Sequence, residues 1–346
     1  MTIREILKGK RILFLSVQTF NYEKEIASQL RSFGAIVNYY DERPANSMLA
    51  KGIIRLKRSA YQTRIDRYYR QLLAIINNQK YDYLFVIKGE VVSDFFLKEF
   101  KINNPDCTCL FYTWDSFANN SHAISILKYF DRCFTFDAND AVKYKLNFRP
   151  LFYIDKYGEI DSQSATKKNL DLLFIGTAHS DRYLISTSII NWCKKQRLTT
   201  FAYYFMQSRI VFVFKKLFDS TFKKIDYKKL SFNSLSVDNI IDLYKTTSVV
   251  LDINHPRQSG LTMRTFEALG AGKKLVTTNA DINRYAFYNE NNICIIDRKN
   301  PQLDIAFFQT PFIAIESGLL YDMSISGWLS EVFVEKKINY WIKDLE

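Results

Sequence analysis

The chain has 346 residues, with 48 Lys and Arg against 36 Asp and Glu, three His and five Cys, and its formal net charge is +12. Only 11 Gly and 6 Pro occur, which excludes collagen-like, low-complexity and linker-rich architectures. Aromatic residues make up 16% of the sequence and apolar residues 47%, so intrinsic disorder is excluded and a folded protein of two domains is expected.

No stretch approaches the roughly 20 consecutive apolar residues that a membrane span requires. The first apolar stretch, residues 12–17, is too short for the hydrophobic region of a secretory signal. We therefore expect a cytoplasmic protein. The five cysteines lack the spacing of a redox or zinc site, so we expect reduced thiols in the core.

Strand-like and helix-like segments alternate through the first half of the chain. The expected strands are residues 11–17, 35–40, 81–88, 107–113, 132–136 and 149–154. Helical periodicity fills the gaps, at residues 22–33, 61–77, 93–100, 119–130 and 139–145. Short apolar strands separated by helices predict a parallel sheet that is covered on both faces.

The polar stretch at residues 156–169 is the best candidate for a linker. After it, strands are expected at residues 171–175, 199–204, 249–253, 274–278 and 293–296, and helices at 182–195, 237–244, 262–270, 283–289 and 301–308. We predict an α/β protein with Rossmann-like domains at 1–155 and 170–323 and closing helices at 324–346. Two doubly wound halves favour a ligand site in the cleft between them, at the carboxyl ends of the strands.

The most informative segment, residues 249–279, reads as a strand, a polar loop, a helix and a second strand. Pro256 and Gly260 end the strand, and Ser259 or Thr262 is placed to cap the following helix. Amides at the start of a helix favour an anion, and Arg257 would add positive charge there.

Glu267 follows Arg264 by three residues and lies on the same face of this helix. Arg264 could pair with a phosphate at the helix start, and a carboxylate one turn below could accept the hydroxyl protons of a ribose. A surface ion pair between the two side chains, which binds nothing, fits the same spacing equally well.

Residues 259–279, SGLTMRTFEALGAGKKLVTTN, resemble the donor-binding segment of glycosyltransferases with the GT-B fold, in particular bacterial capsular and lipopolysaccharide biosynthesis enzymes. Two further segments fit the resemblance: FIGTAHSDR at 174–182 and YTWDS at 112–116. The resemblance implies two Rossmann-like domains facing a cleft, with a nucleotide-sugar donor in the second. Large retaining families of this fold usually carry a Glu-x7-Glu pair. Glu267 matches its second position and Ser259 stands at the first, so inversion and retention both stay open.

The resemblance also implies roles for single residues. Glu267 would hold the ribose, and Gly260, Leu261 and Arg264 would lie near the diphosphate. The loop at 176–179 would approach the diphosphate from the other side, where Arg182 would supply a counter-charge. The expected donor-binding residues are Gly176, Thr177, His179, Arg182, His255, Arg257, Ser259, Gly260, Leu261, Thr262, Arg264 and Glu267. Without a ligand, residues 174–182 read as a strand, a turn and a helix capped by Thr177 or Ser180.

The sequence contains no Asp-x-Asp motif, and its three histidines are scattered. We therefore predict no catalytic metal, and no cofactor besides the nucleotide-sugar co-substrate. An inverting transfer needs a base for the acceptor hydroxyl, and the candidate is Asp115, which follows a strand of the first half. Glu90 is the second candidate, and His122 and His255 are weaker ones. Asp115 fits equally well as the cap of the helix expected near Asn119.

Two stretches carry the positive charge. Residues 51–70 hold seven basic residues and one acidic residue, and residues 194–229 hold ten basic and two acidic residues. The second stretch also contains an apolar arc with helical spacing, which Phe212 and Val213 interrupt: Ile210, Val211, Phe214, Leu217, Phe218, Phe222 and Ile225. Three interpretations stay open: a solvated basic face over an ordinary core, contact with an anionic membrane surface, and nucleic-acid binding, for which no recognised module accompanies the charge.

The resemblance and the site residues together predict a metal-independent glycosyltransferase. It would move a sugar from a nucleotide-sugar to a surface glycan (capsule, lipopolysaccharide or exopolysaccharide), with a glycan or lipid-linked glycan as acceptor. It would be cytoplasmic and peripheral on the inner face of the cell membrane. The alternatives are a polyol-phosphate transferase or sugar-nucleotide epimerase of the same fold, and a basic non-enzymatic module that binds membrane or nucleic acid.

Overall fold

The computed structural model describes residues 1–160, 169–178, 181–256, 258–334 and 340–343, and it divides into two compact units. Unit 1 contains residues 1–150 and 325–334, and unit 2 contains the described residues of 151–324 together with 340–343. The linker expected at 156–169 falls largely on residues 161–168, which lie outside the described residues. Its first residues belong to α8 (Asp155–Gly158), where Tyr157 is buried.

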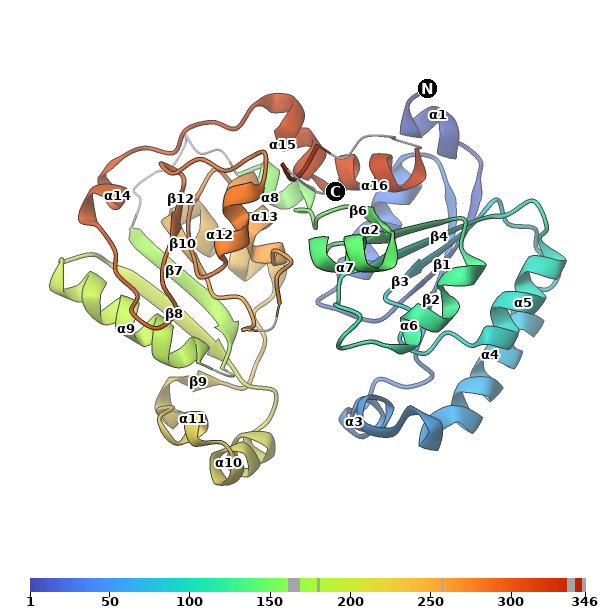
Figure 1. The fold of residues 1–346 in the computed structure, drawn as a ribbon, viewed down its shortest axis with the longest axis horizontal. Coiled ribbons are helices and arrows are strands. Elements are labelled where there is room, and N and C mark those ends of the chain that lie inside the picture. Colours follow the sequence, from blue (N-terminus) through green and yellow to red (C-terminus); the bar gives the residue numbers. More distant parts are fainter. Residues whose placement is uncertain (161–168, 179–180, 257, 335–339, 344–346) are drawn as a thin grey trace. The chain divides into compact units, whose positions relative to one another are not determined.

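Unit 1 is built on a six-stranded parallel sheet in the order β2-β1-β3-β4-β5-β6 (Figure 1). The strands are β1 (Arg11–Ser16), β2 (Ile36–Asp41), β3 (Tyr83–Ile87), β4 (Thr108–Thr113), β5 (Arg132–Thr135) and β6 (Asn147–Phe148). The helices are α1 (Ile3–Leu7), α2 (Tyr22–Ser32), α3 (Met48–Lys57), α4 (Gln62–Ile76), α5 (Asp94–Asn103), α6 (His122–Ile126), α7 (Ala138–Tyr144) and α16 (Ile325–Phe333). Short 3₁₀ helices follow α3 at Arg58–Tyr61 and α6 at Leu127–Tyr129.

Both faces of this sheet are covered, because successive residues of a strand point to opposite sides. Leu13 and Leu15 of β1 pack into one apolar cluster with residues of α4, α5 and α6. Phe14, which lies between them, stacks on Phe85 of β3. The central strands are therefore apolar along their whole length, as the alternation of strands and helices in the sequence predicts.

Unit 2 repeats the plan, with a six-stranded parallel sheet in the order β12-β11-β10-β7-β8-β9 (Figure 1). Its strands are β7 (Leu170–Thr177), β8 (Thr200–Phe205), β9 (Leu230–Ser231), β10 (Thr247–Asp252), β11 (Lys274–Thr277) and β12 (Ile293–Ile295). Its helices besides α8 are α9 (Arg182–Lys195), α10 (Arg209–Phe218), α11 (Ser220–Lys223), α12 (Val237–Thr246), α13 (Met263–Gly270), α14 (Ile305–Gln309) and α15 (Ser317–Met323), with 3₁₀ helices at Tyr227–Lys229 and Ala280–Arg284. The predicted α/β class with two Rossmann-like halves is confirmed.

Helix α16 returns to unit 1 and completes its core. The Trp328 side chain is fully buried, with its ring 4.8 Å from that of Tyr112 and 5.9 Å from that of Phe85. Beside it, Nε of the buried Arg149 lies 2.8 Å from Oε2 of Glu331. A buried ion pair of this kind ties the end of the chain to the residues that follow β6.

Two expected elements are wrong. The strand predicted at 149–154 is replaced by the two-residue β6 at Asn147–Phe148, because Pro150 lacks the amide hydrogen that continued pairing would need. The helix predicted at 283–289 is also absent. A 3₁₀ helix ends at Arg284, and Tyr285 then bridges to Ile342 in an antiparallel arrangement that a helix would not allow.

Helix α10 turns its expected apolar arc outward. Phe212, which the periodicity assigned to neither face, is the buried residue of the helix, whereas Phe214 and Leu217 are 63% and 67% exposed. Of the interpretations that the sequence left open, a basic face over an ordinary core therefore does not describe α10. Phe222 and Ile225, which follow α10, are buried.

The Arg149–Glu331 pair generates a stability prediction. Replacing Glu331→Ala removes the carboxylate beside a fully buried guanidinium, so the free energy of unfolding should fall by about 3–5 kcal/mol. Asp238→Ala breaks the exposed pair with Lys156 and should change the free energy of unfolding by less than about 1 kcal/mol. Urea denaturation of the two variants tests the contrast, and equal small effects would contradict the role given to α16.

Candidate functional site

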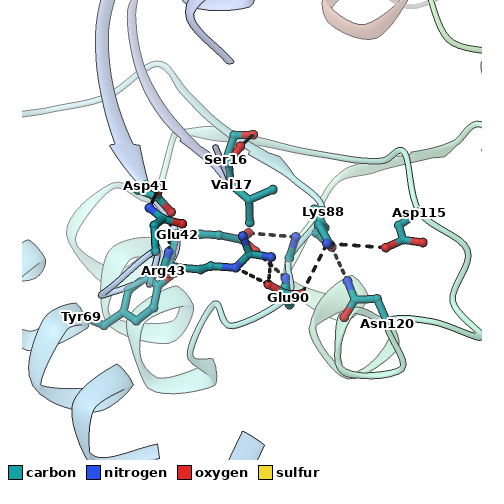
Figure 2. Close-up of polar contacts among 12 residues, drawn as sticks. Ser16, Val17, Asp41, Glu42, Arg43, Tyr69, Lys88, Glu90, Asp115 and Asn120 are labelled. Carbon is teal, nitrogen blue, oxygen red and sulfur yellow. Dashed lines mark hydrogen bonds and ion pairs between the residues drawn. The ribbon is translucent and has the colours of Figure 1, made fainter. Parts of the chain in front are cut away.

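In unit 1, polar side chains lie together after the carboxyl ends of three strands, β2, β3 and β4, as Figure 2 shows. Because parallel strands all end at the same edge of a sheet, residues far apart in the sequence meet there. The cluster comprises Glu42 and Arg43 after β2, Lys88 and Glu90 after β3, and Asp115 after β4. Both carboxylates that the sequence singled out for catalysis, Asp115 and Glu90, therefore lie in one cluster.

Glu90 is buried between two cations. Nε of Arg43 donates to its Oε2 at 2.5 Å, and Nζ of Lys88 lies 3.3 Å from its Oε1. Burial opposes ionisation of this carboxyl, but the charges of Lys88 and Arg43 outweigh it and hold the pKa of Glu90 below its ordinary value. A carboxylate with two cationic partners and little exposure is arranged to orient Lys88.

Asp115 lies on the other side of the same ammonium group (Figure 2). Its Oδ2 is 3.5 Å from Nζ of Lys88, and its Oδ1 accepts a hydrogen bond from Nδ2 of Asn119 at 3.1 Å. The Asp115 side chain is 31% exposed, against 10% for that of Glu90, so a ligand has more access to Asp115. The helix that it was expected to cap begins only at His122, so the capping interpretation is wrong.

Glu42 holds the loop that presents Lys88 and Glu90. Its carboxylate, fully buried, accepts hydrogen bonds from the amides of Gly89 at 3.0 Å and Glu90 at 2.7 Å. Lys88 and Gly89 both have positive φ, of 84° and 64°. A Cβ on Gly89 would lie 2.8 Å from the Phe111 ring, so the loop requires glycine at this position.

His122 has a structural role. Its Nε2 lies 2.8 Å from the carbonyl oxygen of Val92, and burial lowers the pKa of the imidazole. The ring is therefore fixed to the backbone of the segment that follows β3.

In unit 2, the carboxyl ends of the strands gather arginines. Arg182, the first residue of α9, donates to Oγ1 of Thr177 at the end of β7, over 3.2 Å. Burial lowers the pKa of Arg182, the charge of Asp252 raises it, and the charges of Arg298 and Arg264 lower it. Arg182 therefore has both basic and acidic neighbours at this edge of the sheet.

Arg298 is a residue that the sequence analysis missed. It follows β12 and pairs with both carboxylate oxygens of Asp181, at 3.0 and 3.1 Å. Its other terminal nitrogen donates to the Asn254 carbonyl oxygen at 2.5 Å. Its position just after an expected strand could have identified Arg298 as a candidate. Its pairing could not be predicted, because Asp181 lies 117 positions earlier in the sequence.

The start of α13 differs in detail from the prediction. Thr262 is the N-cap residue, but its hydroxyl donates to Oδ2 of Asp252 at 2.7 Å and makes no capping hydrogen bond. Thr265 donates to the same oxygen at 3.1 Å, so Asp252 fixes the first turn of the helix on the end of β10. Gly260 and Leu261, expected near a diphosphate, are both buried in front of this turn.

The Arg264–Glu267 pair forms, but it is not a surface pair. Nη1 of Arg264 lies 3.1 Å from Oε2 of Glu267, and the two side chains are 20% and 6% exposed. The same nitrogen of Arg264 donates to the hydroxyl of Tyr244 at 3.2 Å, and the Tyr244 ring packs against that of Tyr157. The pair therefore belongs to the packed interior of unit 2.

The other predicted donor-binding residues are distributed along these loops. Gly176 and Thr177 end β7, and Thr177 accepts from Arg182 and does not cap α9. The Gln258 amide donates to the His255 carbonyl oxygen, and Asn254 donates to the carbonyl oxygen of Gln258. Asn279 donates to the carbonyl oxygen of Ser259. His179 and Arg257 lie outside the described residues. Within the described part of the chain, no group of three His, Cys, Asp or Glu is placed to hold a metal ion.

No protein-family model matches the sequence, and no curated protein matches it. Among solved structures, an alpha-glucosyltransferase in complex with UDP and a 13-mer DNA is 13% identical, with a TM-score of 0.52 over 94% of this chain and 91% of that one. The catalytic domain of starch synthase IV from Arabidopsis thaliana, bound to ADP and acarbose, is 6% identical, with a TM-score of 0.51 over 96% of each chain. Anabaena HepE in complex with UDP and glucose is 12% identical, with a TM-score of 0.50 over 94% of this chain and 95% of that one.

The chain has the GT-B fold. The fold predicted from the resemblance is thereby confirmed over nearly the whole length. In this GT-B chain, each sheet carries a cluster of charged residues at its carboxyl edge, which is where open α/β sheets bind their ligands.

The buried Glu42 generates a pH prediction. Burial, and then the charge of Glu90, raise the pKa of Glu42 to about 8 from 4.5 in an unfolded chain. Between these values the folded protein binds a proton that the unfolded chain lacks, so its stability should fall as the pH rises, by at most about 1.4 kcal/mol per pH unit. The lowered pKa of Glu90 affects the pH dependence of stability only at more acidic pH.

Glu42→Gln should therefore flatten the pH dependence of the unfolding free energy between about pH 5 and pH 8. Urea denaturation at several pH values in this range measures it. Glu5→Gln, at an exposed carboxyl of α1, is the control and should keep the wild-type slope. Equal slopes in the wild type and in Glu42→Gln would contradict the assignment.

Proposed function

We propose that the protein is a glycosyltransferase that moves a sugar from a nucleotide-sugar to a surface glycan of the capsule, lipopolysaccharide or exopolysaccharide type. The observation that carries the proposal is the placement of Arg182 and Arg298, which we call the arginine cluster, at the carboxyl edge of the second sheet of a GT-B chain. Similar structures contain the nucleoside diphosphates UDP and ADP. The same class of ligand suits the charge and position of the arginine cluster.

In this proposal the diphosphate lies against Arg182 and Arg298. Asp181 already orients Arg298 through two hydrogen bonds, so its guanidinium needs little reordering to meet an anion. As the bond to the sugar breaks, negative charge grows on the leaving diphosphate, and fixed guanidinium groups stabilise it. The chain thus supplies cations for this step from its own side chains, in keeping with the predicted independence of metal.

Glu267 is proposed to accept hydroxyl protons of the ribose. Its carboxylate is held by Arg264 and is largely buried, so a ribose that reaches it would replace little water. The remaining residues expected from the sequence keep their proposed places around the donor: Gly176, Thr177, His179, His255, Arg257, Ser259, Gly260, Leu261 and Thr262.

Asp115 is proposed as the base that takes the proton of the acceptor hydroxyl, in a transfer with inversion. It is more exposed than Glu90, and the Lys88 ammonium and the Asn119 amide fix one oxygen each. Glu90, the second candidate, is better suited to position Lys88, since both of its oxygens already contact cations.

The acceptor is proposed to be lipid-linked, and the protein to work at the cytoplasmic face of the cell membrane. Among the described residues, no helix combines the length and the apolar character needed to cross a bilayer. Attachment would therefore be peripheral, through the basic stretches of the sequence.

The donor site is tested by the melting temperature in the presence of UDP, GDP, CMP, TDP and ADP. A nucleotide at about 100 times its dissociation constant stabilises by about 2.7 kcal/mol, or several degrees for units of this size. We expect such a shift with one nucleotide, and its loss in Arg298→Ala. Arg197→Ala, at an exposed position of unit 2, should keep the shift. Absence of a shift with every nucleotide would contradict the proposed site.

The base is tested by Asp115→Asn. We expect transfer to fall by about 10²–10⁴-fold while the nucleotide-induced shift stays, because the substitution removes a proton acceptor and leaves unit 2 unchanged. Asp106→Asn, at an exposed position before β4, is the control. Full activity of Asp115→Asn would exclude Asp115 as base. The mass of the product separates sugar transfer from polyol-phosphate transfer, which adds phosphorus, and from epimerisation, which adds no mass.

A further inference from the structure

Helix α10 exposes the apolar face that an amphipathic helix normally buries. Five residues spaced three and four positions apart form this face, which we call the α10 apolar strip: Ile210, Val213, Phe214, Leu217 and Phe218. Their exposed fractions lie between 56% and 81%. Large apolar side chains scattered singly over a surface are common, but a continuous strip of five on one helix marks a binding surface.

The strip is held outward by specific contacts. Phe212, on the opposite side of α10, is 2% exposed and contacts the rings of Phe222 and Tyr227. Ser208 caps the start of α10 by accepting from the Val211 amide. Figure 1 shows α10 and α11 at one end of unit 2, past β9, with α10 outermost. The helix is thus anchored through Phe212, with Val211 partly buried beside it, and the strip stays exposed.

Basic residues are concentrated in and after α10, and Arg209, Lys215 and Lys216 lie on the helix itself. Between positions 209 and 229 the chain has seven basic residues, Arg209, Lys215, Lys216, Lys223, Lys224, Lys228 and Lys229, against the two acidic residues Asp219 and Asp226. The ammonium groups of Lys215 and Lys216 lie over the Phe222 and Phe212 rings, at 4.9 and 5.8 Å. Apolar and cationic groups therefore share one surface.

We propose that α10 docks on an anionic lipid bilayer, with the α10 apolar strip in the interfacial region and the lysines in and after α10 against the headgroups. An apolar strip combined with Lys and Arg on one helix is the arrangement that lies in the plane of a membrane interface. A second copy of the chain would bring the same lysines together, which like-charge repulsion disfavours. Nucleic acid would use the lysines but would leave the five apolar residues in water.

This inference rests on the proposed function in one respect. A lipid-linked acceptor requires the enzyme to work at a membrane surface, and the α10 apolar strip gives unit 2 a means to stay there. The docking surface contains none of the residues proposed for the donor or the base, so binding to lipid and transfer of sugar are separable.

Sedimentation of the full chain with vesicles tests the proposal. We expect binding to vesicles with about one third phosphatidylglycerol and much weaker binding to phosphatidylcholine alone. Phe214→Ser/Phe218→Ser should weaken binding to the anionic vesicles roughly tenfold or more. Lys223→Gln/Lys224→Gln should weaken it less and reduce the difference between the two lipids. Ile102→Ser, at a position of α5 that is 77% exposed, is the matched control and should bind like the wild type.

Two results of the vesicle experiment would overturn the proposal. One is wild-type protein that does not bind anionic vesicles, and the other is a Phe214→Ser/Phe218→Ser variant that binds them as the wild type does. Analytical ultracentrifugation of the wild type and of the same variant tests whether the strip instead mediates self-association. A wild-type dimer that the double variant abolishes would assign the strip to a second copy and overturn the lipid docking. A failure of the proposed function can be distinguished from a failure of the lipid docking. In the first case the protein would bind vesicles, but it would transfer no sugar and no nucleotide would shift its melting temperature.

Discussion

Parallel pairing of the strands is the constraint on which the rest of the structure depends. Each parallel strand must be followed by a return across a face of the sheet, so helices cover both faces and the central strands become apolar throughout. The same constraint brings all carboxyl ends to one edge. There the backbone has left the sheet, and residues separated by up to 117 positions meet, as Arg298 and Asp181 do.

The charged groups at these two edges are held differently. In unit 1 they are nearly all buried, and Arg43 and Lys88 pair with Glu90 around a loop with two positive φ angles. Burial of a carboxyl that accepts two backbone amides fixes this loop, and only Asp115 extends toward solvent. In unit 2, Arg182 and Arg298 are partly accessible, and each has a partner that orients it. The carboxyl edge of the unit 1 sheet is thus suited to present one carboxylate to a ligand, and that of the unit 2 sheet is suited to bind an anion.

Helix α10 departs from the rule that apolar faces are buried. It buries one phenylalanine and exposes five large apolar side chains next to a concentration of lysine. The cost of exposing such a face in water is offset only when another surface covers it. A membrane interface does so, and it would also raise the local concentration of a lipid-linked acceptor.

The sequence by itself determined the class of fold, both sheets, the positions of most strands, and Asp115 and Glu90 as charged residues at a strand edge. These predictions depend on local properties of the sequence: apolar runs, helical periodicity, and proline and glycine at the ends of elements. Only the tertiary structure decided that Arg298 meets Asp181, that Glu42 supports residues 88–90, and that the Arg264–Glu267 pair is buried. It also decided which side of α10 faces water. A periodic pattern identifies the two faces of a helix, but which one is buried depends on what the rest of the chain packs against it. Here the side of α10 that carries Phe212 packs against Phe222 and Tyr227.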